Sequence, residues 1–284
     1  MRKFLVFFGL LALLIGAAKQ EAKAQIVDGA YKREDLKDRK PTTLPFIREA
    51  DVMWRKKVWR IIDLREKMNQ PLYFPTKPID KRYSLINLML KGIQEEKLIA
   101  YDARNDDEFL VPMKFEQVKE AFGATTRTQM VKDVDTGESK AKQVTGEIRS
   151  EEVKQFMIKE EWYFDKQTST MKVKIIGICP IQEFYREDDP NQENVRRRQV
   201  FWIYFDEARD LMAANEVFNP QNTARNLSFD DVFLKRKFNS YIVKEENIYD
   251  NRAIDKYLGS KDAMLESQRI ENSIFDYEQN LWEY

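Results

Sequence analysis

The chain has 284 residues, with 48 basic and 48 acidic side chains, one cysteine and no histidine. Without histidine, Ser-His-Asp and Cys-His catalytic arrangements and histidine metal sites are excluded. The balanced charge lacks the basic excess of a nucleic-acid-binding domain, so we expect no nucleic-acid partner. The one cysteine, Cys179, cannot form an internal disulfide; it is either buried and inert or pairs between chains.

The first 24 residues have the pattern of a removable secretory signal peptide. Arg2 and Lys3 precede an apolar run over 4–18, and Ala22-Lys23-Ala24 is a small-residue cleavage motif before Gln25. A membrane anchor is the alternative, but the run is shorter than the roughly 20 residues that a spanning helix needs. We therefore predict cleavage between Ala24 and Gln25 and an exported mature chain. The residue directly after the motif is Gln25 and not a cysteine, so no N-terminal lipid is expected.

Residues 25–47 are polar and carry two prolines around a short Thr-Thr-Leu stretch. Proline keeps the residue before it extended, and the segment has too few apolar residues for a core of its own. It predicts an extended arm, either disordered or reaching across to a neighbouring chain. Pro41, Leu44 and Pro45 are its candidate contact residues.

Arg48–Met68 is predicted to be an amphipathic helix. Its broad apolar stripe follows helical spacing and comprises Trp54, Val58, Ile61, Ile62, Leu64 and Met68. Val52 and Trp59, seven residues apart, form a second small ridge. A helix with two apolar faces has to bury both, in the core or against a partner, so Val52 and Trp59 are candidate interface residues. An interfacial membrane helix is the weaker alternative.

Two further helices are predicted before the middle of the chain. One runs from Ser84, an N-cap candidate, to Leu98. The other runs from Lys114 to Phe122 and ends at Gly123, because glycine favours the conformation that closes a helix.

The middle of the chain predicts antiparallel strands. Phe156–Asp165 and Thr170–Cys179 are rich in aromatic and β-branched residues and are joined by a four-residue loop, which fixes the hairpin register. The predicted pairs are Phe164 with Met171, Trp162 with Val173, Phe156 with Cys179, Glu161 with Lys174 and Tyr163 with Lys172. This register places Cys179 on the apolar face, which favours the inert thiol. Asp135–Glu138 predicts the turn of an earlier hairpin, and Gln199–Asp206 predicts a further strand.

The C-terminal part is predicted to be helical. Ser228–Asp231 has a capping-box pattern before a helix over Val232–Val243, and a last helix begins near Ser260. In the last helix, apolar residues recur at spacings of four and three. This seam has about two heptads, too few to stand alone, so it must pack on the body or on another chain. It comprises Ile270, Ile274, Tyr277, Leu281 and Tyr284.

Few residues suggest chemistry. Asp106, Asp107 and Glu108 lie in a predicted loop that lacks the glycine and glutamate of a calcium-binding loop, so a solvated loop or helix cap is expected. Two distant carboxylates could serve a glycoside hydrolase, but the sequence selects no pair. Arg196–Arg198 predicts a solvated basic loop, with docking to an acidic partner or lipid headgroups as the alternative. No catalytic, cofactor-binding or metal-binding residue is predicted.

Several blocks of sequence are specific enough to carry a family resemblance. They are DVMWRKKVWRIIDLREKMNQPLYFP at 51–75, AYDARNDDEF at 100–109, EEWYFDKQTSTMKVKIIGICPI at 160–181, SFDDVFLKRKFNSYIVKEENIYDNRAI at 228–254 and DAMLESQRIENSIFDYEQNLWEY at 262–284. Together they cover most of the mature chain. With these blocks the chain resembles the GldN/PorN family of Bacteroidetes, periplasmic components of the type IX secretion system and gliding machinery.

The resemblance implies a structural role with no catalytic residues. It implies a ring formed by self-association with a GldK/PorK-like lipoprotein beneath the outer membrane, and a GldM/PorM-like periplasmic domain as a further partner. The mature chain would then meet the membrane only through partners. An exported carboxylate-dependent glycan hydrolase and a stand-alone periplasmic binding module remain the alternatives.

The predicted fold class is α+β. Amphipathic helices pack on a central antiparallel β-hairpin sheet, with an extended N-terminal arm and a helical C-terminus. We expect a signal peptide over 1–24, the arm over 25–47 and a single domain over 48–284. A sub-boundary is possible in the polar linker 187–198.

Overall fold

The computed structural model describes residues 39–79, 82–104, 107–124, 127–132, 139–144, 146–185, 195–222 and 226–282. Several predictions fall outside these residues. They are the signal peptide with its cleavage site at Ala24 and Gln25, the arm before residue 39, the Asp135–Glu138 turn, and Tyr284.

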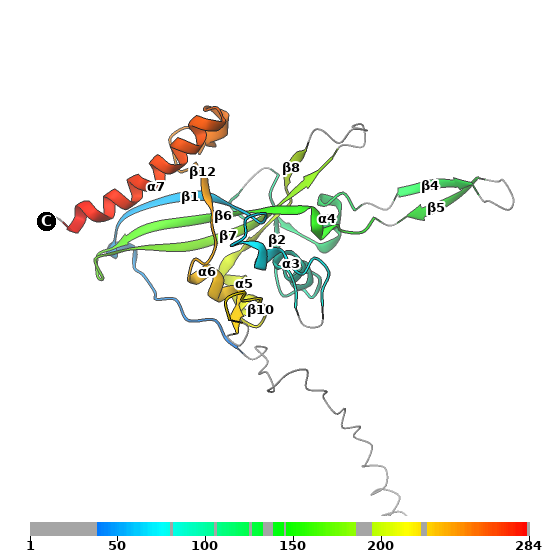
Figure 1. The fold of residues 1–284 in the computed structure, drawn as a ribbon, viewed down its shortest axis with the longest axis horizontal. Helices are drawn as coiled ribbons and strands as arrows, with labels where there is room; N and C mark the ends of the chain where they lie inside the picture. Colours follow the sequence, from blue (N-terminus) through cyan, green and yellow to red (C-terminus); the bar gives the residue numbers. More distant parts are fainter. Residues whose placement is uncertain are drawn as a thin grey trace, which may run out of the picture. The chain divides into compact units, whose positions relative to one another are not determined.

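One antiparallel sheet organises the fold (Figure 1). Its strands are β1 (Val52–Asp63), β2 (Ala100–Asp102), β3 (Pro112–Met113), β6 (Val153–Asp165), β7 (Thr170–Phe184), β8 (Arg196–Gln199), β9 (Phe201–Tyr204) and β12 (Tyr241–Glu245). They follow the order β12-β1-β6-β7-β9-β2-β3, with β8 paired to β7. Two smaller ribbons pair β4 (Arg127–Lys132) with β5 (Ser139–Val144) and β10 (Glu216–Val217) with β11 (Leu227–Ser228). With the helices described next, the sheet confirms the predicted α+β class.

The predicted central hairpin is β6 and β7, and its register is confirmed near the turn. Four predicted pairs are observed: Phe164 with Met171, Tyr163 with Lys172, Trp162 with Val173 and Glu161 with Lys174. The fifth pair is wrong, because a bulge between Lys159 and Glu160 shifts the register by one residue. Cys179 therefore pairs with Met157, and Phe156 pairs with Pro180.

The helix predicted over 48–68 is wrong, because Val52–Asp63 is the strand β1, paired with β6 on one side and β12 on the other. Val58 packs in the apolar cluster beside the C-terminal helix, whereas the next residue, Trp59, packs with Cys179. Neighbouring side chains of a strand point to opposite faces, so β1 is covered on both faces. Because β1 carries apolar residues on both faces, its sequence lacks the alternation of apolar and polar residues that is typical of a strand. Its apolar residues instead fall at spacings that are typical of a helix.

The helices α2 (Gln70–Tyr73), α3 (Leu85–Gln94), α4 (Phe115–Ala121) and α5 (Phe205–Ala213) contribute to the main apolar core against the sheet. The predicted N-cap of α3 is confirmed, since the Ser84 hydroxyl accepts a hydrogen bond from the backbone of Asn87 at 3.3 Å. Gly123 follows α4 with a φ of 76°, as predicted for a helix end. The predicted strand over Gln199–Asp206 is shorter than expected, because β9 ends at Tyr204 and α5 begins at Phe205.

The helix predicted over Val232–Val243 is correct only at its start. Helix α6 (Phe229–Leu234) begins at the predicted capping box, in which the Asp231 backbone donates to the Ser228 hydroxyl at 3.1 Å. Arg236 then takes a φ of 48°, which ends the helix. The chain continues into the edge strand β12, whose pairing with β1 overrides the helical pattern.

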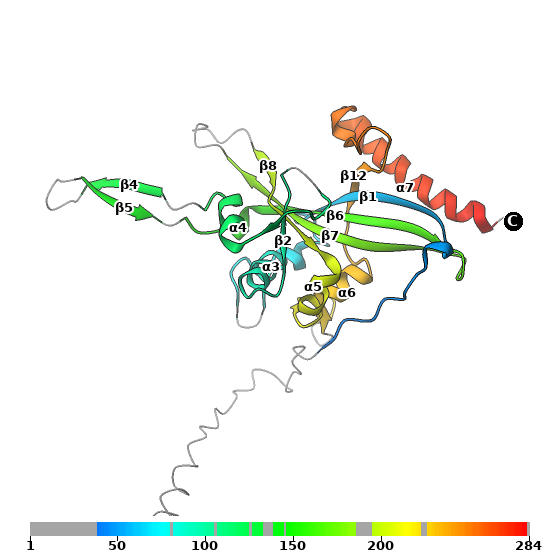
Figure 2. The same ribbon diagram turned by 180° about the vertical axis from the view of Figure 1, so that it is seen from behind.

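The last helix, α7 (Ser260–Trp282), begins where predicted and lies alongside β12 in both views (Figure 1 and Figure 2). Ile270 and Ile274 of its seam are buried against Val58 and Ile242. The Ser267 hydroxyl accepts a hydrogen bond from the Ile242 backbone at 3.0 Å, so the helix also covers the free edge of the sheet.

Candidate functional site

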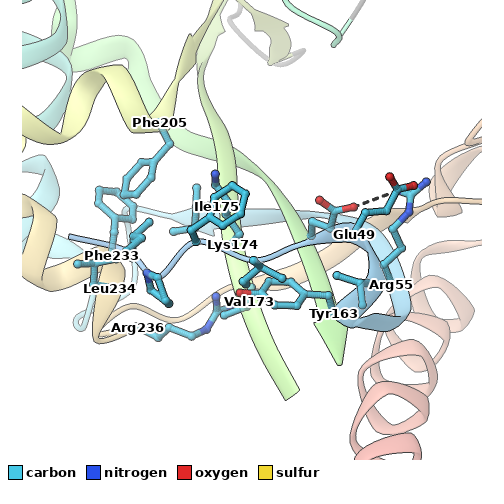
Figure 3. A pocket seen from close by; sticks show the side chains of 16 residues that line it. Glu49, Arg55, Tyr163, Val173, Lys174, Ile175, Phe205, Phe233, Leu234 and Arg236 are labelled. Carbon is cyan, nitrogen blue, oxygen red and sulfur yellow. Dashed lines mark hydrogen bonds and ion pairs between the residues drawn. The ribbon is translucent and has the colours of Figure 1, made fainter. Parts of the chain in front are cut away.

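A groove lies between the N-terminal arm and the body of the fold (Figure 3). Its cavity volume is about 470 Å³. Leu44–Ile47 of the arm form one wall, and residues of β1, β6, β7, α5 and α6 form the others. We take this groove as the candidate functional site and call it the arm groove.

The body side of the arm groove is largely apolar. Ile175 of β7 belongs to the same apolar cluster as Phe205 of α5 and Phe233 of α6, and Val173, two residues earlier in β7, also lines the groove. The rings of Phe205 and Phe233 meet edge to face, with centroids 5.6 Å apart. This surface exists because the alternating residues of a strand meet the apolar side of two short helices.

Most of the charged groups that line the arm groove have a partner of opposite charge, either in the groove or next to it. Arg55 donates to Glu161 at 3.0 Å, which raises the pKa of the Arg55 guanidinium. Lys174 lies 2.8 Å from Asp206, and that hydrogen bond raises the pKa of the Lys174 ammonium. Burial raises the pKa of Tyr163, so its hydroxyl stays protonated. Paired charges above an apolar floor suit the binding of an apolar polypeptide segment better than acid–base chemistry.

The arm is fixed to the body by two polar contacts. Arg39 forms an ion pair with Asp231 at 2.8 Å, and the Thr42 carbonyl accepts a hydrogen bond from the Arg209 guanidinium. Arg209 also donates to Asp230 at 3.0 Å, and both side chains of that pair are buried. The contacts place Arg39 and Thr42 of the arm beside the acidic first turn of α6 and the neighbouring Arg209.

The apolar side chains of the arm are less engaged. Leu44 and Ile47 are half-buried, whereas Phe46 lies at the rim of the groove with 91% of its surface exposed. The arm therefore lies along the apolar side of the groove, but its side chains do not fill the cavity.

The structure brings three of the predicted interface residues together at the arm groove, namely Leu44, Pro45 and Val52. Pro41 lies in the arm and is half-buried. Trp59 is placed elsewhere: it is 1% exposed and packs inside the fold with Cys179. Its burial follows from the strand geometry of β1.

The predicted seam of α7 packs within the chain. Ile270 and Ile274 are buried, and Tyr277 stacks on Trp54 with ring centroids 4.8 Å apart. Leu281 lies in the last turn of α7, but its side chain is outside the described residues, as is Tyr284. The sequence predicted that this seam packs either on the body of the protein or on another chain, and the structure shows it on the body.

Sequence reasoning missed the residues that hold the arm. Arg39 and Arg209 belonged to no motif, because single charged residues are usually solvated, and Asp230 was noted only as part of the capping-box pattern. The capping-box pattern at Ser228 was the available signal, since it fixed the position of Asp231.

The surroundings of Cys179 and Asp107 test two predictions about reactive side chains. Cys179 is buried and unpaired, as predicted, and burial raises the pKa of its thiol. Asp107 lies in a loop, as predicted, but its side chain is half-buried: it accepts a hydrogen bond from Lys244 at 2.9 Å and lies 3.5 Å from Lys159. Burial alone would raise the pKa of Asp107, but these two lysines lower it below its usual value. Asp106 lies outside the described residues.

The basic run Arg196–Arg198 forms β8 instead of a loop. Arg197 donates to Glu183 at 3.0 Å, and Arg198 donates to Gln182 at 2.7 Å, both on the neighbouring strand β7. Within the described residues, no group of three or more histidine, cysteine, aspartate or glutamate residues could hold a metal ion. None of the helices described is long and apolar enough to cross a membrane.

Fold and groove together define an α+β protein whose candidate site is suited to contacts between polypeptide segments. The chain belongs to the GldN family: the family model described as gliding motility associated protein GldN matches residues 47–283. It is thereby a component of the gliding-motility and type IX secretion machinery, in a family of structural components. A search of curated proteins found no match for the chain.

Proposed function

We propose that this chain is a non-enzymatic structural subunit of a periplasmic secretion and gliding complex. In this proposal it associates with itself and with a GldK-like lipoprotein in a ring, and it contacts a GldM-like periplasmic domain. The observation that carries the proposal is the GldN family match over residues 47–283. The predicted signal peptide over 1–24 supports export, and a lipoprotein partner would hold the mature chain at the outer membrane.

The arm groove supports a role in assembly. Part of its lining comes from the arm itself, so its shape depends on where the arm lies. A groove of this kind is better suited to contacts between chain segments than to a small molecule, which favours largely preformed pockets. Leu44, Pro45 and Val52 are therefore the predicted interface residues that we retain as surface contacts.

The test is to isolate a tagged chain from its source cells with gentle detergent, with and without the gene for the lipoprotein partner. The expected result is a large complex that contains several copies of the chain and the lipoprotein. In cells without the lipoprotein, the chain should leave the outer-membrane fraction. A tagged chain that is monomeric in extracts of both strains would contradict the proposal.

A further inference from the structure

The body carries a docking site for the arm that is built without the arm. Asp230 is held by Arg209 at 3.0 Å, and Asp231 is held by Lys235 at 2.6 Å and by the Ser228 hydroxyl at 3.0 Å. These contacts lie within α5, α6 and the residues next to them. The acidic end of the site therefore keeps its geometry whichever arm occupies it.

An arm in the site also adds a hydrogen bond that the body does not supply. Arg209 is 7% exposed, and one of its nitrogens donates to the Thr42 carbonyl of the arm. If the arm leaves, this charge-assisted hydrogen bond is lost, while the same nitrogen keeps a longer hydrogen bond to Asp230 at 3.3 Å. An empty site is disfavoured, while a site filled by an equivalent arm is not.

The arm can leave as a unit. A short 3₁₀ turn over Glu49–Asp51 separates it from β1, and the Asp51 carbonyl accepts a hydrogen bond from the Lys166 backbone at 2.8 Å. The pairing of β1 with β6 then begins at Val52 with Asp165. Rotation at the turn would move the arm and leave the strand pairing in place.

We propose that the arm of one copy occupies the arm groove of a second copy. This arm exchange deepens the proposed function, because it rests on self-association of the chain. A second copy presents the same Arg39 and Thr42 carbonyl to the same Asp231 and Arg209, so the contacts are kept while two subunits become linked. Arg39 of the arm adds a second cationic partner to Asp231, which Lys235 also pairs with.

Phe46 gives a direct probe of the exchange, because it lies at the groove rim and its exposure makes replacement harmless to the fold. Two full-length copies with different tags, each with benzoylphenylalanine in place of Phe46, are expressed together and irradiated in gentle extracts. The expected result is a covalent product that carries both tags, with the link mapped to groove-lining residues of β6, β7 or α6 in the second copy. The matched control carries benzoylphenylalanine in place of Phe275, an aromatic residue of α7 that is also exposed. It should give several-fold less of this product.

The outcomes separate the exchange from the proposed function. If the two tags are isolated together but every Phe46 link lies within one chain, the exchange is overturned and self-association stands. Links from Phe46 only to a different protein overturn the exchange in the same way and point to a partner in the groove. If the tags are not isolated together and no product carries both, self-association and the exchange both fail.

Discussion

At the scale of single residues, Glu160 shows how this sheet tolerates a buried charge. Its side chain is fully buried, and it accepts hydrogen bonds from Arg236 at 2.8 Å and from the Trp162 indole at 3.2 Å. Glu160→Ala would leave the partly buried guanidinium and the indole without their acceptor. We expect the free energy of unfolding to fall by about 3 kcal/mol, in the range for breaking a buried ion pair.

Urea denaturation of the chain from Gln25 onward measures this loss. The matched control is Glu161→Ala on the next position of β6, because Glu161 pairs with the more exposed Arg55. An exposed ion pair contributes about 0–1 kcal/mol, so the control should change stability little. Equal losses in the two variants would contradict the role assigned to Glu160.

Asp63 gives a prediction for the acid range. Partial burial alone would raise its pKa, but hydrogen bonds from Arg65 and Gln155 outweigh burial and lower it to about 2. The unfolded-state pKa is about 3.9, so the contribution of Asp63 to stability is present above that value and is lost as the pH falls towards 2. Asp63→Asn should therefore flatten the decline of stability between roughly pH 4 and 2. Thermal unfolding across this range checks it, and an unchanged slope would contradict it.

At the scale of elements, α7 is held to the sheet by its apolar seam. Ile270 is 1% exposed in the cluster with Val58 and Ile242, so Ile270→Ala would leave a cavity. We expect a loss of about 2–5 kcal/mol in the free energy of unfolding. Phe275→Ala, on the exposed side of the same helix, should cost less than about 0.5 kcal/mol. Denaturation curves of both variants test this, and similar losses would mean that the seam is not packed as described.

The elements that were predicted correctly from the sequence are those whose conformation depends on residues close together in the chain. The hairpin of β6 and β7, the N-cap at Ser84 and the capping box at Ser228 each depend on local spacing, and each is observed. The prediction failed for β1 because its two faces pack in different clusters, which no single period describes. It failed for β12 because pairing with a strand far away in the chain decided its conformation.

The candidate site was predictable only in part. Prolines indicated an extended arm, and the structure places Leu44 and Pro45 of that arm along the groove. The opposite wall is assembled from β7, α5 and α6, which are distant in sequence, and no local pattern reports such an arrangement. Arg209 received no assignment because its role depends on a buried contact with Asp230 and the arm.

At the scale of the whole molecule, the arm and the body differ in how much the fold depends on them. The family match begins at residue 47, and the arm before it is joined to the body by the Arg39 and Thr42 contacts. The apolar clusters lie in the body, so the body should fold without the arm. Arm exchange requires this property, because an arm that belonged to the core could not be traded between copies at low cost.

Deletion of residues 25–47 tests this independence. The lost acceptor of Arg209 should reduce the free energy of unfolding by about 1–3 kcal/mol. Each kcal/mol corresponds to about 2–4 °C in the melting temperature of a domain of this size. Calorimetry should therefore show a single cooperative transition at a moderately lower temperature. Phe46→Ser in the full chain is the control and should leave the transition unchanged, because Phe46 is exposed. Loss of the cooperative transition on deletion would show that the arm is part of the core, and the low cost on which arm exchange depends would be gone.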